Sequence, residues 1–175
     1  MATGDAIFPE EATIYIVAAD AASSSATGLN VTAEVTNFTS SGGEEDVESV
    51  PVFGGGNIDK VKPRTQIEVS FDVVLRYGAS SSVLKWDEFA MGTAASSTVS
   101  SDGDAVPKAI YIQFTDGSNY YTMAYNNAKG ITFEPDVAAD DMATGTMTFK
   151  LSPTDADGNP NKKVTSLVAS GITWS

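Results

Sequence analysis

The chain contains no cysteine and no histidine among its 175 residues. Disulfides, zinc-thiolate sites, cysteine nucleophiles, Ser-His-Asp triads and imidazole general bases are therefore excluded. Basic residues are also scarce, since 10 Lys and Arg stand against 23 Asp and Glu and leave a net charge of −13. Proteins that hold nucleic acid neutralise its phosphates with basic side chains. The composition therefore argues against tight nucleic-acid binding and is compatible with a surface past which DNA slides.

Long hydrophobic runs are missing as well. No apolar stretch approaches the ~18 residues that span a bilayer, and we expect no membrane association. The N-terminal sequence MATGDAIFPEE lacks the basic and apolar regions of a signal peptide, which favours synthesis in the cytoplasm. A length of 175 residues and a hydrophobic content of 42% fit a single globular domain over residues 1–175.

Alternating apolar and polar residues dominate what is present. In the longest run, the apolar positions are Ile67, Val69, Phe71, Val73, Leu75 and Tyr77, and the intervening positions are Glu68, Ser70, Asp72, Val74 and Arg76. This period of two is typical of a half-buried strand. Shorter runs predict strands over residues 12–19, 29–36, 110–115, 121–125, 146–151 and 164–169. The layout predicts an all-β fold with one short helix, most simply a β-sandwich.

The single helix is expected over residues 81–91. Trp86 and Phe89 recur at helical spacing after serines that can cap the N-terminus, and Gly92 follows as a C-terminal cap. We expect the apolar side of this helix to close one end of the core. Residues 20–28 and 92–107 are rich in small residues and are expected to be exposed loops.

The segment before the longest strand predicts a protruding hairpin, the arm, over residues 41–65. It runs from an acidic stretch through three glycines to a basic stretch, and the glycines permit a tight reversal. The expected cross-strand pairs are Val52 with Ile58, Glu48 with Lys62, and Asp46 with Arg64. Pro51 and Pro63 confine the hairpin to an edge. Because the arm has little to bury in its own domain, it either stays in solvent or docks on a neighbour.

The sequence SGGEEDVESVPVFGGGNIDKVKPRTQIEVSFDVVL and its surroundings, residues 36–90, resemble the major tail tube protein of long-tailed, siphovirus-like bacteriophages. In that family a glycine-rich arm with acidic and then basic residues precedes the longest strand of a β-sandwich. The resemblance implies a structural virion protein of the tail that assembles with itself into stacked hexameric rings. The sheets then form a continuous β-barrel lining of a tube, through which double-stranded DNA passes during ejection without specific binding. Other tail proteins are further implied partners.

Two sets of residues are expected to serve this function. The subunit interface of the arm is predicted at Asp46, Glu48, Phe53, Gly54, Gly55, Gly56, Lys60, Lys62 and Arg64. The lining of the channel is predicted at Glu34, Glu68 and Asp72, on the polar side of the strands. An acidic lining repels phosphates and keeps DNA mobile. Arg76 falls on the same side as Glu68 and Asp72 and works against this assignment.

Other functions have weaker signals. Asp155, Asp157 and Asn159 have a spacing that suits a hard cation, yet the distal bidentate ligand is missing and a plain turn is the simpler interpretation. Tyrosines within residues 111–125 could form a platform for sugars, and paired carboxylates of a glycosidase need proximity only in space. We predict no catalytic, cofactor-binding or metal-binding residues. An extracellular carbohydrate- or calcium-binding sandwich and a capsid decoration protein remain as alternatives.

Overall fold

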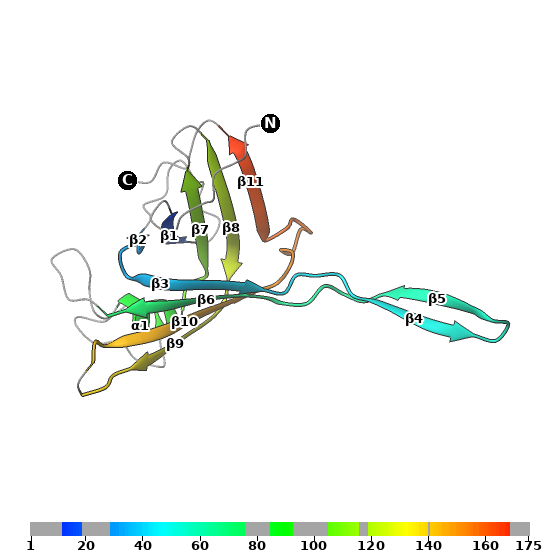
Figure 1. Ribbon diagram of the computed structural model, residues 1–175, viewed down its shortest axis with the longest axis horizontal. Helices are drawn as coiled ribbons and strands as arrows, with labels where there is room; N and C mark the ends of the chain where they lie inside the picture. The colour runs from blue at the N-terminus through cyan, green and yellow to red at the C-terminus, as the bar shows by residue number, and fades with distance from the viewer. Residues whose placement is uncertain are drawn as a thin grey trace.

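The computed structural model describes residues 12–18, 29–75, 85–92, 105–115, 119–139 and 141–168. Within these ranges the chain forms two antiparallel sheets, a separate two-stranded hairpin and one short helix (Figure 1). The all-β prediction with a short helix is confirmed. Neither described sheet is closed into a barrel. The described helix has neither the length nor the apolar character needed to cross a bilayer.

The five-stranded sheet has the strand order β11-β8-β7-β1-β2. Its members are β1 (Ala12–Ala18), β2 (Leu29–Asn30), β7 (Lys108–Thr115), β8 (Tyr120–Ala128) and β11 (Lys162–Val168). β7 and β8 pair as a hairpin, with Thr115 opposite Tyr120. These two strands correspond to the runs predicted over residues 110–115 and 121–125, and residues 116–118 lie outside the described part.

The four-stranded sheet has the order β3-β6-β10-β9. Its members are β3 (Val35–Ser41), β6 (Ile67–Val74), β9 (Gly130–Asp136) and β10 (Thr144–Leu151). The alternation predicted for β6 is confirmed, because Val69 and Phe71 are buried whereas Glu68 and Asp72 are exposed. The strand ends at Val74 and is therefore shorter than predicted, and Arg76 and Tyr77 lie outside the described residues.

The expected strand over residues 29–36 is interrupted by a turn at residues 32–34, which separates β2 from β3. The side chain of Asn30 accepts hydrogen bonds from the backbone N–H of Thr32 (3.0 Å) and from its hydroxyl (2.7 Å). The same hydroxyl oxygen accepts the N–H of Ile14 at 2.8 Å. These local side-chain hydrogen bonds favour a turn over an extended backbone. The alternating pattern therefore wrongly predicted one continuous strand here.

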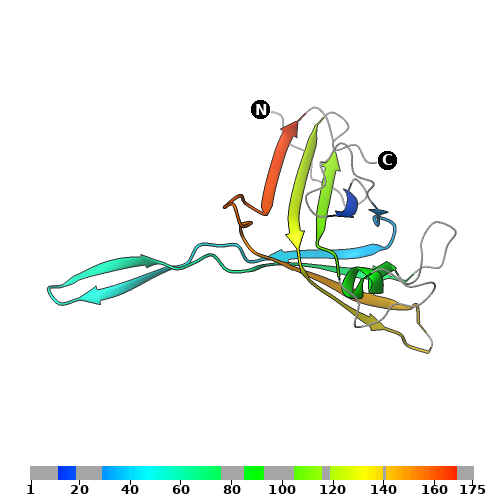
Figure 2. The same cartoon turned by 180° about the vertical axis from the view of Figure 1, so that it is seen from behind.

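The core lies between the two sheets, whose strands cross at a steep angle (Figures 1 and 2). Ile110 and Ile112 from the five-stranded sheet join Val69, Phe71 and Phe149 from the four-stranded sheet in one buried cluster. The rings of Phe71 and Phe149 meet edge to face, with centroids 5.8 Å apart, a favoured aromatic geometry. Each sheet thus turns one face inward, as a sandwich requires.

The helix α1 (Lys85–Met91) covers part of this core beside β9. Trp86 is buried and stacks edge to face with Phe89, with 5.8 Å between ring centroids. Gly92 has a φ of +103°, and its N–H donates to the Glu88 carbonyl at 3.0 Å. This left-handed glycine ends the helix as predicted. The predicted start at residue 81 falls among residues outside the described part.

Candidate functional site

The arm consists of β4 (Val47–Val52) and β5 (Gly56–Val61), which extend away from one end of the four-stranded sheet (Figure 1). Every residue of both strands is exposed. The chain reverses through Phe53, Gly54 and Gly55, and the two glycines have φ values of +121° and +86°. These left-handed angles suit glycine because it has no Cβ. The predicted hairpin arm is present, and no other described segment of the chain covers its strands.

The cross-strand pairing within the arm differs from the prediction by two residues. Val50 lies opposite Ile58 and Glu48 opposite Lys60, and the pairing ends with Val52 opposite Gly56. The prediction was wrong because the turn uses Phe53 as its first residue, so that Gly56 belongs to β5. A shift of two residues leaves every side chain on its expected face, since side chains alternate with period two.

Charged residues cluster on one face of the arm near its root. The Lys62 ammonium lies 3.0 Å from the Asp46 carboxylate and 3.8 Å from that of Glu48. The Lys62 N–H also donates to the Asp46 carbonyl at 2.8 Å. Ion pairs this exposed contribute about 0–1 kcal/mol each. They favour one register of the hairpin but add little stability. Arg64 lies beyond the paired strands and is exposed.

Apolar side chains also lie on the arm surface, beside its charged groups. Phe53 at the turn is fully exposed, and the other exposed apolar residues of the arm are Val47, Val50, Val52, Ile58 and Val61. Apolar groups gathered on a surface mark interaction sites. The sequence had shown these residues, but not that both faces of the arm would leave them uncovered.

The root of the arm is held by a tight backbone crossing at Gly42 and Gly43. Their φ values are +82° and +80°. The N–H of Gly43 donates to the Thr65 carbonyl at 3.1 Å. A Cβ on Gly42 would collide with the carbonyl oxygen of Gln66. Glycine is required here because the backbones of the two connecting segments touch.

The outward face of the four-stranded sheet is polar across all four strands. Strand pairing and exposure place on it Asn37, Thr39 and Ser41 of β3, Glu68, Ser70 and Asp72 of β6, Thr146, Thr148 and Lys150 of β10, and Thr132 and Glu134 of β9. Asp136 at the end of β9, opposite Thr144, also lies on this face, so four carboxylates and one lysine stand among short hydroxyl side chains. We call this surface the polar face. It holds no aromatic side chain that would anchor a tight complex, and its one apolar side chain, Val74, is half-buried.

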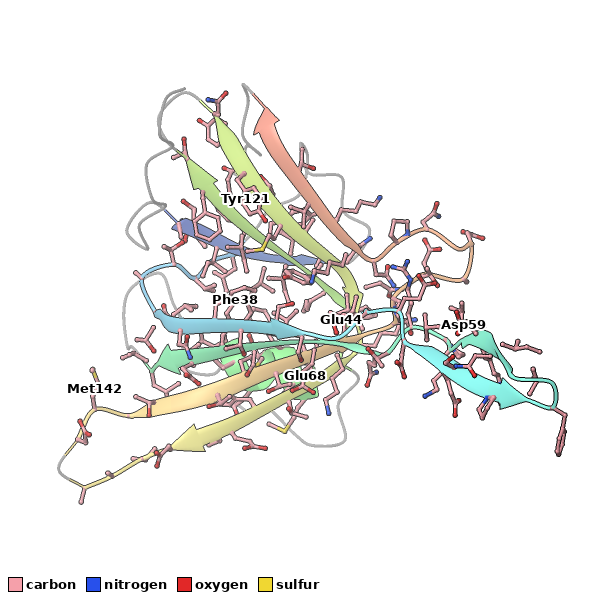
Figure 3. The ribbon with its side chains drawn as sticks, turned by 45° about the vertical axis from the view of Figure 1, so that its right-hand side comes forward. Phe38, Glu44, Asp59, Glu68, Tyr121 and Met142 are labelled. Carbon is pink, nitrogen blue, oxygen red and sulfur yellow. The ribbon has the colours of Figure 1, made fainter. Side chains whose placement is uncertain are left out.

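The structure brings Glu68 and Asp72 together on the polar face (Glu68 is labelled in Figure 3). Glu68 pairs with Lys150, with 3.5 Å between the charged atoms. Asp72 accepts hydrogen bonds from the Asn37 amide at 3.0 Å and from the Thr146 hydroxyl at 3.1 Å. Glu34 is not part of this group, because it lies in the turn before β3 and only 7% of it is exposed. Glu134 was not among the predicted residues, yet it lies opposite Thr146 of β10, whose other neighbour across the sheet is Asp72.

The two alternative sites are the loop at Asp155, considered for a cation, and the tyrosines within residues 111–125, considered for a sugar. Both carboxylate oxygens of Asp155 are occupied within its own loop, by the N–H groups of Asp157 (2.9 Å) and Asn159 (2.8 Å) and by the Asn159 side-chain amide (3.0 Å). The predicted turn is present. No cluster of three potential metal ligands occurs among the described residues. Tyr125 is buried in the core, so it is not available for a sugar platform.

No family model and no curated protein matches the sequence. Several solved structures contain chains of similar fold. A chain of an extracellular contractile injection system, in the structure of the PVC sheath/tube terminator in the extended state, has a TM-score of 0.54 and 12% identity over 95% of this chain and 100% of its own. A chain of the anti-feeding prophage tube-terminating cap has a TM-score of 0.55 and 12% identity over 95% of each chain. A chain of the anti-feeding prophage baseplate has a TM-score of 0.57 and 8% identity, covering 94% of this chain and 97% of its own. At these identities the likeness establishes a shared fold across nearly the whole chain.

Proposed function

We propose that the chain is a structural subunit of a phage tail or a tail-like particle and that it assembles into stacked hexameric rings forming a tube. Its partners are further copies of itself and other tail proteins, and its activity is assembly, not catalysis. The tube is the conduit through which double-stranded DNA passes. The residues that build it are those of the arm and of the polar face.

The observation that carries this proposal is the four-stranded sheet with two open edges. Within the described residues, β3 and β9 each have one strand partner. One face of the sheet is buried in the core, and the other is the polar face. An unpaired strand presents a row of free N–H and C=O groups that another chain can bind. A sheet with two such edges can be extended from both sides.

Pairing β3 of one copy with β9 of the next extends the sheet around a ring. The two edges are different surfaces, so the contact is heterologous, and such contacts close into rings when the rotation permits. Closure removes every free edge, as in a β-barrel. The polar face of each copy then points to the same side of the wall. We place that side at the lumen because it is hydrophilic and carries more acidic than basic groups.

The known structures of similar fold support the same assignment. They come from a sheath/tube terminator, a tube-terminating cap and a baseplate. Each of these proteins is part of a tail-like assembly. The fold is therefore used in such particles. The arm and the open sheet edges provide this chain with surfaces for assembly into a particle of that kind.

Sedimentation velocity and electron microscopy of the purified protein over a concentration series test the proposal. We expect a shift from monomers to rings and then to hollow tubes, or tubes on addition of the initiating tail proteins. A chain that stays monomeric at every concentration and with those proteins present contradicts the proposed function. Binding to capsids without tube formation would instead favour a decoration protein.

A further inference from the structure

Exposed apolar side chains are concentrated at opposite ends of the four-stranded sheet. The ten large ones in the described part of the chain are Val47, Val50, Val52, Phe53, Ile58, Val61, Val106, Val137, Met142 and Val164. The first six belong to the arm. Val137 and Met142 flank the turn between β9 and β10. Figure 3 places Met142 at the end of the sheet opposite the arm, on which Asp59 is labelled.

On the arm, the distal apolar residues share one face. Val50 lies opposite Ile58, and Val52 opposite Gly56, so these side chains point to the same side because alternate residues share a face. Together with Phe53 at the turn they form a group that we call the tip patch (Val50, Val52, Phe53 and Ile58). Its exposed fractions range from 39% to 111%. Nothing else in the described chain covers the tip patch, since β4 and β5 contact chiefly each other.

The opposite end of the sheet bears a smaller apolar group, the turn patch (Val137 and Met142). Their exposed fractions are 70% and 61%. Asp136 and Asp141 are exposed beside them. The N–H of Met142 donates to the Asp141 carboxylate at 2.7 Å, which fixes that acid next to the methionine. The turn patch is thus apolar with an acidic border.

The charges near the two patches are complementary. Lys60 shares the face of the tip patch, because it lies opposite Glu48, two residues from Val50. Lys62 is held by Asp46. Lys60 itself makes no ion pair with the described residues. Lys60 is therefore a basic group on the face of the tip patch that can approach the acidic border of the turn patch of a second copy.

We propose that the tip patch of one copy docks on the turn patch of another copy, head to tail along the strands of the four-stranded sheet. The inference rests on the proposed function and names the surfaces that join successive rings. Val50, Ile58 and Phe53 pack on Val137 and Met142, and Lys60 lies near the acidic border. Because the two patches differ, the contact is heterologous and leaves a free patch at each end. Addition of rings can therefore continue.

Cysteine cross-linking tests this contact directly, because the natural chain has no cysteine. The test variant carries Ile58→Cys and Met142→Cys in the full chain. The control carries Ile58→Cys and Val164→Cys, since Val164 is a similarly exposed apolar residue on the other sheet. Tubes of each variant are verified by electron microscopy and treated with a short bis-maleimide. We expect a ladder of covalent oligomers from tubes of the test variant, and little or none from dilute monomers or the control.

The outcomes separate this inference from the function on which it rests. Tubes of the test variant that give no ladder, or a ladder equally strong in the control, overturn the docking while leaving tube formation intact. If the unmodified chain forms no tubes under any condition, the proposed function fails and the docking fails with it. Mixing the single variants Ile58→Cys and Met142→Cys should stop the ladder at dimers, because each chain then has one reactive end.

Discussion

On the polar face, the ammonium group of Lys150 lies 3.5 Å from the carboxylate of Glu68, and both side chains are about half exposed. The pairing of β6 with β10 places the two residues opposite each other. Asp72, on the same strand, is bonded to the neutral groups of Asn37 and Thr146. The negative charge of Glu68 is therefore balanced locally, whereas that of Asp72 is not. Because exposed pairs contribute at most ~1 kcal/mol, the difference matters for the potential of the surface more than for stability.

The first prediction concerns the charge of the channel. Replacing Glu68 and Asp72 together by Lys turns two negative charges into positive ones on an exposed face, so the sandwich should still fold. DNA should then be retained in the tube, because lysines neutralise phosphates and release counterions. Ejection through tails built from this variant should slow at low ionic strength and recover at high ionic strength, where the attraction is screened.

The matched control for this experiment is the neutral pair Glu68→Gln and Asp72→Asn. It removes the negative charges without adding positive ones, and ejection should respond much less to salt. Intact tails of the lysine variant that eject normally at every salt concentration would place the polar face outside the channel.

The second prediction concerns removal of the arm. Residues 44–64 can be replaced by Asn-Gly, because Gly43 and Thr65 are already hydrogen-bonded across the root and Asn-Gly favours a two-residue hairpin. The core cluster contains no residue of the removed segment. Urea denaturation should show nearly unchanged stability of the body, and electron microscopy should show no tubes. Unfolding of this variant, or normal tubes, would contradict the role given to the arm.

The third prediction compares two glycines of the arm. Gly42→Ala places a Cβ against the Gln66 carbonyl at a left-handed backbone position, whereas Gly55→Ala has a similar φ and no atom within 4 Å. The left-handed region alone costs a residue other than glycine about 1–2 kcal/mol. We expect Gly42→Ala to lower the free energy of unfolding by more than ~2 kcal/mol. Gly55→Ala should affect the arm tip and change global unfolding by less than ~1 kcal/mol. Equal effects would show that the root is not tightly packed.

The fourth prediction is a pH dependence of the 155–159 loop. The side-chain amide of Asn159, followed by backbone N–H groups, holds the pKa of the Asp155 carboxyl below its ordinary value. A depressed pKa means that the ionised form stabilises the folded loop. This contribution is present above the ordinary aspartate pKa of about 3.9 and is lost as the pH falls through the depressed value. NMR signals of the Asp157 and Asn159 amides should stay in place down to that ordinary value and shift below it. The isosteric Asp155→Asn variant should show no such transition, and a loop that rearranges at higher pH would contradict the assignment.

The sequence predicted those features that depend on local residue patterns. The alternation in β6, the left-handed Gly92 after the helix and the turn at Asp155 each follow from neighbouring residues, and the structure has all three. The arm could also be predicted, because glycines between two charged stretches permit a reversal. Its register could not, since a shift of two residues keeps Glu48 and Lys60 on the same face and the pattern remains equally good.

Features that depend on contacts between residues far apart in the sequence could not be predicted. Glu34 stood in an alternating run, yet the chain forms a turn there in which the Thr32 hydroxyl accepts the N–H of the distant Ile14, and Glu34 is buried. The partner of Glu68 is Lys150, whose strand is far along the chain. Val137 and Met142 could not be recognised from the sequence, because only the folded sheet places Met142 at the end opposite the arm.

A cryo-electron-microscopy reconstruction of the assembled protein tests the central claim most directly. The account predicts a hollow tube with six copies per ring, in which β3 of each copy pairs with β9 of its neighbour and the polar face lines the channel. A reconstruction in which β3 and β9 remain unpaired between copies, or in which the polar face lies on the outer wall, would contradict the account.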